Sequence, residues 1–377
     1  MRVINSIADL RELAERRVPR SIFDYMDRGS YDELTLGRNR SDLDALKFRQ
    51  RVMIDVSKQN MATRILGAPA SMPLVIGPTG MAGMVHGDGE ILAAQAAEAF
   101  GIPFCLSTVS ICSIEDVRGA VATPFWFQLY VMKDRGYTSE LIDRAEAAGC
   151  PVLMMTADIP VSGLRRRDPK NGLSVPPRLT LRNAMDIATK PRWLWSVLRG
   201  RRREFGNLAA AVSRTRGTTF AQWLTSQFDA SVTWKDLEAV RARWKGKLIV
   251  KGIMDPEDAR QVVELGADAL VVSNHGGRQL DGSCSTIEAL PGVVDAVKGR
   301  CEVLFDGGIR SGQDVVRALA MGAQSCMIGR AYIHGLGAAG EAGVAKAIDI
   351  IAKEMSVTMG LCGVNSVAEI DERVLAL

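Results

Sequence analysis

Short apolar segments recur along the chain and predict eight buried β-strands. Each is rich in Val, Ile, Leu or Met and is bounded by Gly, Pro or polar residues. The segments are 73–78, 103–107, 124–129, 152–156, 248–251, 269–273, 303–306 and 325–329. Between most of them apolar residues return at helical spacing, as in Gly89–Phe100 and Pro256–Leu265. Alternating strands and helices predict parallel βαβ units, and continuously apolar strands predict a sheet covered on both faces.

The number and spacing of these units predict a (β/α)8 barrel, the TIM-barrel fold of the α/β class. Successive strands begin 21–34 residues apart, except that 96 residues separate the starts of the fourth and fifth. We therefore expect a long insertion between strands 4 and 5, over residues 170–230. Residues 1–70 precede the first strand and should form a helical cap, with a helix and a loop over Arg20–Tyr31. We expect residues 1–377 to form a single domain.

A polar or glycine-containing group follows every predicted strand. In order, these groups are Pro78-Thr79-Gly80, Ser107, Gln128 with Tyr130, Thr156 with Asp158, Lys251, Ser273 with His275, Asp306 with Gly308, and Gly329 with Arg330. In a barrel the carboxyl ends of all strands meet at one mouth, where active sites lie. One such residue is adequately explained as a strand terminator, but eight in succession indicate a site.

The last two strands end in glycines and arginines, as Asp-Gly-Gly-Ile-Arg-Ser-Gly at 306–312 and as Gly329-Arg330. Barrels bind phosphate after strands 7 and 8, where backbone N–H groups, a helix N-terminus and a cation meet the anion. The pairing of two such turns predicts a phosphate site.

His275 stands out among the three histidines of the chain. It follows strand 6 directly, whereas His86 lies in a glycine-rich turn and His334 in an expected helix, where we expect partly buried structural imidazoles. Histidine suits a general base near neutral pH because its ordinary pKa lies there. Arg278, three residues later, supplies a planar group that can hold a carboxylate.

The nonapeptide Ser-Asn-His-Gly-Gly-Arg-Gln-Leu-Asp at 273–281 resembles the signature of the FMN-dependent L-2-hydroxy acid oxidases and dehydrogenases. Further matches are FDY at 23–25, PTGM at 78–81, LST at 106–108, FQLY at 127–130, T-x-D-x-P at 156–160, VKG at 250–252, DGG-x-R at 306–310 and IGR at 328–330. The resemblance covers nearly the whole chain. It is strongest to the membrane-associated bacterial lactate dehydrogenases, and it implies FMN as cofactor, a homotetramer, and oxidation of a small L-2-hydroxy acid such as L-lactate.

The resemblance also implies a role for each matching residue. The catalytic group would be His275 as base, Asp158 as its orienting carboxylate, Tyr130 near the substrate hydroxyl and Lys251 at the flavin N1. The substrate group would be Tyr25, Arg165, Arg278 and Tyr130, with Val109 where other members carry an aromatic residue. The cofactor group would be Pro78, Thr79, Gly80, Ser107, Gln128, Thr156, Lys251, Ser273, Asp306, Gly308, Arg310, Gly329 and Arg330.

The chemistry of a 2-hydroxy acid fits these residue types. Two arginines would hold its carboxylate, and His275 would take a proton while Asp158 stabilises the imidazolium. The sequence leaves open whether that proton comes from the hydroxyl group or from C2. It also leaves open an oxidase that uses O2, a mandelate-type dehydrogenase, another phosphate-binding barrel enzyme, and an inactive membrane-attached scaffold.

Charge is concentrated in the insertion. Residues 165–203 hold 12 Lys and Arg against 2 acidic residues, although the whole chain has a net charge of only +4. Trp193 and Trp195 lie within this basic stretch, and we expect both to be exposed. Tryptophans beside cations suit a membrane interface. The resemblance favours the membrane, because the membrane-associated bacterial lactate and mandelate dehydrogenases carry a basic, apolar segment at this place. It therefore implies that residues 170–215 bind an anionic membrane on its cytoplasmic side, with a quinone as electron acceptor. The alternative is a lid on a cytoplasmic enzyme.

Cysteine usage and charge pattern narrow the remaining classes. None of the seven cysteines forms a C-x-x-C pair, so we expect neither a disulfide framework nor a metal site. The basic residues are confined to one segment of an otherwise acidic chain, so we expect no nucleic-acid partner. No apolar stretch is long enough for a membrane-spanning helix.

Overall fold

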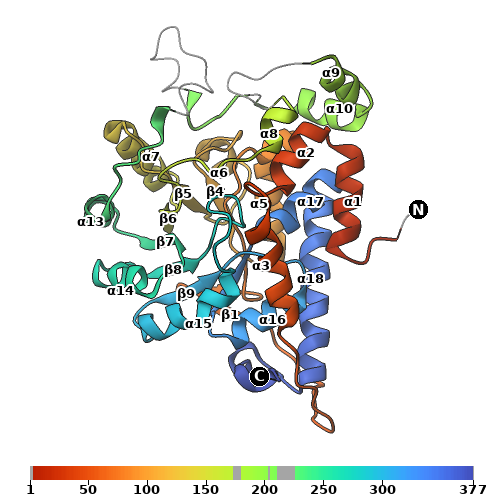
Figure 1. The fold of residues 1–377 in the computed structure, drawn as a ribbon, viewed down its shortest axis with the longest axis vertical. Coiled ribbons are helices and arrows are strands. Elements are labelled where there is room, and N and C mark those ends of the chain that lie inside the picture. The colour runs from red at the N-terminus through yellow and green to blue at the C-terminus, as the bar shows by residue number, and fades with distance from the viewer. Residues whose placement is uncertain (1–2, 173–179, 203, 210–225, 377) are drawn as a thin grey trace.

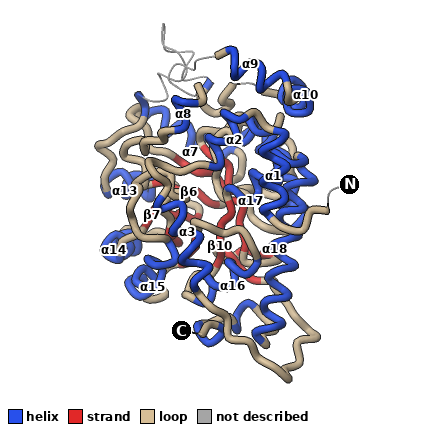
Figure 2. The backbone as a smooth tube through the Cα atoms, turned by 45° about the vertical axis from the view of Figure 1, so that its right-hand side comes forward, coloured by secondary structure: helices blue, strands red, loops and turns tan. Residues whose placement is uncertain are grey.

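The computed structural model describes residues 3–172, 180–202, 204–209 and 226–376. Its centre is a sheet of eight parallel strands, surrounded by helices (Figures 1 and 2). In chain order the strands are β3 (Leu74–Ile76), β4 (Cys105–Ser107), β5 (Trp126–Leu129), β6 (Val152–Thr156), β7 (Lys247–Ile253), β8 (Ala269–Val272), β9 (Glu302–Phe305) and β10 (Ser325–Ile328). β10 pairs with β3, and a parallel bridge from Ile76 to Phe104 joins β3 to the chain entering β4, which closes the barrel. The predicted (β/α)8 fold is confirmed.

A helix follows each strand and covers the outside of the barrel. These helices are α5 (Gly89–Phe100), α6 (Ile114–Arg118), α7 (Arg135–Ala147), α13 (Trp234–Arg243), α14 (Pro256–Glu264), α15 (Thr286–Val297) and α16 (Gly312–Ala320), followed by α17 (Arg330–Ala339) and α18 (Glu341–Cys362). Two short 3-10 helices, Val367–Glu369 and Glu372–Val374, end the described chain. The strands are apolar on both faces because one face meets these helices and the other fills the barrel.

The barrel interior is packed with side chains. Val75, Met154, Val271 and Met327 are among its fully buried residues. The hairpin of β1 (Thr63–Ile65) and β2 (Ala68–Ala70) adds to the same cluster. Because the interior is filled, a ligand has room only beyond the strand ends.

Residues before the barrel form the predicted helical extension, which consists of α1 (Ile7–Arg17), α2 (Arg20–Asp27) and α3 (Leu34–Ala45). Ser6 and Asp9 form a capping box that starts α1. α1 lies beside α17, and α2 lies near the top of α17 in Figure 1. The cap thus reaches the barrel mouth and places Tyr25 of α2 there.

The predicted insertion lies between β6 and β7. Its described helices before α13 are α8 (Arg167–Lys170), α9 (Leu181–Ala188) and α10 (Pro191–Arg199), while the four-residue α4 (Ala82–Val85) follows β3. Residues 173–179, 203 and 210–225 of the predicted insertion lie outside the described residues. α9 and α10 form one end of the molecule (Figures 1 and 2). Among the described helices, none is both long and apolar enough to cross a membrane.

The expectation that Trp193 and Trp195 are both exposed is right for Trp195 and wrong for Trp193. Trp195 is 58% exposed, but Trp193 is half-buried, and its indole Nε1 donates a hydrogen bond to the carbonyl of Met84 at 2.8 Å. The two residues lie two positions apart on one helix and therefore face different directions. Spacing alone could not tell which of them faces the protein body.

Candidate active site

A cavity of about 630 Å³ opens at the carboxyl ends of the barrel strands. The predicted site residues that line it are Tyr25, Pro78, Thr79, Gly80, Val109, Gln128, Tyr130, Thr156, Arg165, Lys251, His275, Arg278, Asp306, Gly308, Arg310, Gly329 and Arg330. Ser107, Asp158 and Ser273 lie behind this lining, each hydrogen-bonded to a residue that forms it. The structure therefore brings together residues that the sequence spreads over about 300 positions.

His275 and Asp158 form a pair at the edge of the cavity. Nδ1 of His275 lies 2.9 Å from Oδ1 of Asp158, which leaves Nε2 as the ring nitrogen able to exchange a proton with a bound molecule. Burial acts to raise the pKa of Asp158, but His275 and Lys251 outweigh it and the net pKa is lowered. Gly252 makes room for the carboxylate, because a Cβ at that position would lie 2.6 Å from Asp158 Cβ.

The backbone around His275 adopts an uncommon conformation. His275, Gly276 and Gly277 have φ values of 56°, 64° and 72°, all in the left-handed region. Glycine enters this region freely, whereas histidine does so at a cost of roughly 1–2 kcal/mol. Such strain persists where the surrounding contacts impose it, and it is common at functional sites.

Two arginines and a tyrosine gather at one side of the cavity. The guanidinium carbons of Arg165 and Arg278 lie 5.1 and 4.9 Å from the ring centroid of Tyr25. Nε of Arg165 also bonds Asp168 at 2.7 Å, so that side chain is held in place. Burial lowers the pKa of Arg278, as expected for a cation whose neighbours include another arginine. The arrangement suits a bound carboxylate, which would meet two cations and a phenol.

Lys251 is buried beneath the cavity and remains charged. Its Nζ lies 2.7 Å from the hydroxyl of Ser273 and 3.0 Å from Oδ2 of Asp306. Burial acts to lower the pKa of Lys251, but the carboxylates of Asp306 and Asp158 outweigh it, and the pKa is raised. A lysine held this way can stabilise negative charge that develops on a molecule in the cavity.

Arg310 and Arg330 form a cationic corner. Both are half-buried in the cavity wall, and their side-chain hydrogen bonds among the described residues go to backbone carbonyls. Burial and neighbouring arginines lower the pKa of Arg310 to about 10 and that of Arg330 to about 9. In the described part of the chain neither forms an ion pair with a carboxylate, so a bound anion would supply the missing negative charge.

The same cavity fits FMN. Its phosphate matches the cationic corner of Arg310 and Arg330. Nε2 of Gln128 and Oδ1 of Asp306 are buried without a hydrogen-bond partner among the described residues. Buried polar atoms are seldom left unpaired, so an unpaired donor and acceptor facing a cavity indicate a ligand with polar groups. The flavin ring and the ribityl hydroxyls carry such groups.

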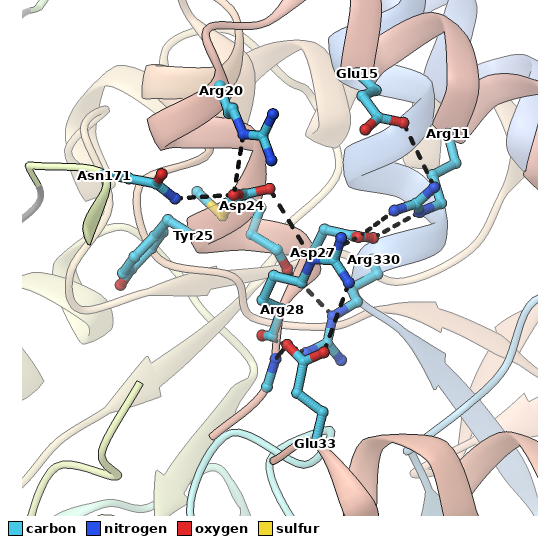
Figure 3. Close-up of polar contacts among 12 residues, drawn as sticks. Arg11, Glu15, Arg20, Asp24, Tyr25, Asp27, Arg28, Glu33, Asn171 and Arg330 are labelled. Carbon is cyan, nitrogen blue, oxygen red and sulfur yellow. Dashed lines mark hydrogen bonds and ion pairs between the residues drawn. The ribbon is translucent and has the colours of Figure 1, made fainter. Parts of the chain in front are cut away.

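The cap contains a buried cluster that the sequence did not suggest (Figure 3). Asp27 accepts two hydrogen bonds from Arg11, at 3.0 and 2.6 Å. Its Oδ1 also lies 3.0 Å from Nε2 of His334. Nearby, Arg330 donates to the carbonyls of Met26 and Arg28. This cluster joins α1 and α2 to α17 and so fixes the position of Tyr25. His334 is a structural imidazole, as expected, but it is completely rather than partly buried.

The insertion contributes two aromatic residues that sequence reasoning missed. Phe205 and Phe228 line the cavity, and Phe228 packs edge-on against Tyr130 with ring centroids 5.9 Å apart. Burial raises the pKa of Tyr130, so its phenol stays protonated. Asn207, fully buried, accepts a hydrogen bond from Ile114 N and anchors the segment beside Phe205. No local motif marks these residues. Phe228 packs on Tyr130, and Asn207 bonds Ile114, Tyr137 and Arg144, all of which are more than 60 positions away.

Comparison with known proteins agrees with this site. The model of the FMN-dependent dehydrogenase family matches residues 14–377. The L-lactate dehydrogenase of Caulobacter vibrioides (strain NA1000 / CB15N) is 50% identical over 376 residues, covering 99% of this chain and 98% of that protein. The L-lactate dehydrogenase of Ectopseudomonas mendocina (strain ymp) is 48% identical over 375 residues, covering 99% of each chain.

Solved structures give the same result. The crystal structure of the monotopic membrane protein (S)-mandelate dehydrogenase superimposes with a TM-score of 0.93 at 34% identity, covering 99% of each chain. A mandelate oxidase superimposes with a TM-score of 0.83 at 36% identity, covering 99% of this chain and 98% of its own. With the cationic corner and the unpaired polar groups facing the cavity, these matches show that the chain belongs to the FMN-dependent dehydrogenase family and uses FMN as its cofactor.

Proposed function

We propose that this FMN-dependent L-2-hydroxy acid dehydrogenase oxidises L-lactate to pyruvate. The observation that carries the proposal is the placement of a base and a carboxylate clamp in one cavity: His275 with Asp158, and Arg165 with Arg278 beside Tyr25. Relatives about 50% identical over the whole chain carry the name L-lactate dehydrogenase. Lactate offers the matching groups, a carboxylate next to a carbon that bears a hydroxyl and a hydrogen.

Each residue has a separate task in this reaction. Arg165 and Arg278 hold the substrate carboxylate, which fixes C2 and its hydroxyl relative to the base. His275 accepts a proton at Nε2, and Asp158 stabilises the charged ring through Nδ1. FMN supplies the two-electron acceptor. Lys251 would stabilise negative charge on FMN bound in the cavity.

The side-chain pocket is consistent with a substrate larger than glycolate. Val109 occupies a position where a bulkier residue would fill the cavity, and Phe228 adds an apolar wall. A second candidate substrate is (S)-mandelate, because the dehydrogenase with a TM-score of 0.93 acts on it. The test compares kcat/KM for L-lactate, glycolate and (S)-mandelate. We expect the highest value for L-lactate, and a higher value for either competitor would overturn the assignment.

We also propose that the enzyme attaches to the cytoplasmic face of a membrane through α9 and α10. Exposed apolar residues line these helices: Leu181, Met185, Leu194, Trp195 and Leu198. Basic side chains flank them, and Arg199 lies 4.2 Å above the Trp195 ring. Each basic residue near an anionic surface contributes about 1 kcal/mol. A structural relative of the whole chain is described as a monotopic membrane protein.

Vesicle sedimentation tests this attachment. The change is Trp195→Ser with Leu198→Ser, and the matched control is Val357→Ser with Leu361→Ser on α18, where the side chains are similarly exposed. We expect intact protein and control to sediment with phosphatidylglycerol vesicles at low salt and the α10 variant to stay in solution. If the intact protein does not sediment, the membrane proposal fails and the insertion is a lid.

The membrane surface also favours a quinone as electron acceptor over O2. The measurement is the rate at which the reduced enzyme is reoxidised by a short-chain ubiquinone and by air. We expect the quinone reaction to be faster, and faster reoxidation by air would make the enzyme an oxidase.

We further propose that residues 1–377 form one domain and that four chains assemble. The holoenzyme should then unfold in a single cooperative transition and show four times the mass of the chain in light scattering. Two separate transitions or a monomeric mass would contradict these proposals.

A further inference from the structure

Gln279 belongs to the nonapeptide after β8, but the proposed reaction gives it no task. All the polar atoms of its side chain are engaged with one other segment, the loop that follows β6. Nε2 donates to the carbonyl of Asp158 at 2.9 Å and to that of Val161 at 3.0 Å. Oε1 accepts from the backbone N–H of Gly163 at 3.0 Å. One amide thus holds three points of a neighbouring loop.

The two joined loops carry the reacting groups. The loop after β8 holds His275 and Arg278, and the loop after β6 holds Asp158 and Arg165. The proton-accepting pair and the carboxylate clamp therefore each have one member in either loop. Neither pair keeps its geometry unless the two loops keep their positions relative to each other.

Close backbone packing supports the same contact. A Cβ on Gly163 would lie 2.3 Å from the carbonyl oxygen of Arg278 and 2.9 Å from Cα of Gln279. The loop after β6 thus lies directly against the backbone of the nonapeptide. Only glycine allows this approach.

Few other hydrogen bonds to the main chain hold this stretch of the loop. The last ladder bond of β6 is from Ala157 N to Lys251 O, and the next backbone bond to another segment is from Tyr31 N to the carbonyl of Leu164. In the described structure, the main-chain bonds that tie residues 158–163 to other segments are the three made by Gln279. Loops without regular structure move easily when such bonds are lost.

We propose that Gln279 is a positioning residue that holds Asp158 against His275 and keeps Arg165 beside Arg278. The proposal rests on the proposed function, because it takes His275 as the base. Without the amide, the carboxylate no longer meets the ring at a fixed distance, and proton transfer from the bound substrate slows. A displacement of about 1 Å at a reacting group can cost roughly 100-fold in rate.

The test is Gln279→Met, which keeps the length and apolar volume of the side chain but removes the amide. The control is Gln95→Met on α5, whose amide makes one hydrogen bond, to the carbonyl of Ala120. The rate of flavin reduction by saturating L-lactate, measured without oxygen, should fall about 100-fold in the first variant and stay unchanged in the second. In both variants, FMN content should match that of the wild type, and Tm should stay within a few degrees of the wild-type value.

Two further measurements separate positioning from general support of the fold. Oxalate, a dicarboxylate probe for the arginine clamp, should bind the Gln279→Met enzyme several-fold more weakly. In an Asp158→Asn background, Gln279→Met should cost clearly less than about 100-fold in flavin reduction, because the charged pair that it positions is already lost and only the arginine clamp still depends on it. Additive losses in the double variant would overturn the proposal, and so would loss of FMN together with activity.

The variant His275→Gln distinguishes two outcomes: that this inference is wrong, or that the proposed function is wrong. If His275→Gln is inactive and Gln279→Met is fully active, Gln279 does not position the pair, although the base assignment stands. If His275→Gln reduces its flavin normally, the base assignment is wrong and the positioning proposal falls with it.

Discussion

Replacing His275 with glutamine removes the proposed base while disturbing its surroundings least. The glutamine amide can still donate to Asp158, whose Oδ1 lies 2.9 Å from His275 Nδ1. The side chain is similar in reach, and the position lies at a strand end rather than in the barrel core. An amide has no nitrogen that accepts a proton near neutral pH. The change therefore tests basicity rather than packing.

The expected loss follows from the geometry. A positioned general base contributes about 10²- to 10⁴-fold in rate. Here the largely buried carboxylate of Asp158, whose pKa is lowered, stabilises the charged ring as it forms. Opposite charges about 4 Å apart near a protein surface interact by roughly 4 kcal/mol, or about three powers of ten in rate. We therefore expect flavin reduction to fall by about 10⁴-fold, at the upper end of the range.

Anaerobic stopped-flow mixing with L-lactate measures this loss directly, as bleaching of the oxidised flavin. His86→Gln is the matched control, because His86 is half-buried and does not line the cavity. It should reduce its flavin at the wild-type rate. Both variants should bind FMN normally. A His275→Gln enzyme within tenfold of wild type would refute the assignment of His275 as base.

Three other changes have defined outcomes. Arg278→Lys keeps the charge but loses the planar fork, so kcat/KM for L-lactate should fall at least about 100-fold, and a smaller loss would mean that charge alone suffices. Lys251→Met should weaken the binding of sulfite, which forms an anionic flavin adduct, by at least about tenfold, and unchanged affinity would remove Lys251 from this role. Burial lowers the pKa of His334 to about 4, below its ordinary value near 6.5. The unfolded chain therefore binds a proton between those values that the folded chain does not, and stability should fall by up to about 3 kcal/mol as pH drops from 6.5 to 4. His334→Gln should flatten this dependence of Tm on pH, and an equally steep loss in the variant would assign it to other groups.

The sequence was a sufficient guide to the barrel because strand pattern is a local property. The starts of all eight predicted strands lie within two residues of the observed ones, since a strand buried on both faces is mostly apolar. The polar residues at the strand ends could be assigned to one mouth for the same reason, because parallel strands in a closed barrel all point one way.

The pattern of the sequence could not predict contacts between distant segments. Phe228 meets Tyr130, and Asp27 meets His334, across separations of about 100 and 307 residues. Neither pair has a local spacing that would reveal it. The prediction that Trp193 is exposed failed for a related reason. The sequence of an amphipathic helix reveals its apolar face, but it does not reveal how much of that face the rest of the protein covers.

The sequence by itself thus determined the fold class, the strand order along the chain and the set of residues at the barrel mouth. These follow from periodicity and from the chemistry of short motifs. Tertiary structure alone decided which of those residues touch. It placed Ser107, Asp158 and Ser273 behind the cavity wall and bound the loops after β6 and β8 through Gln279. Such contacts depend on where loops of irregular backbone come to rest, and that is set by packing across the whole barrel rather than by neighbouring residues.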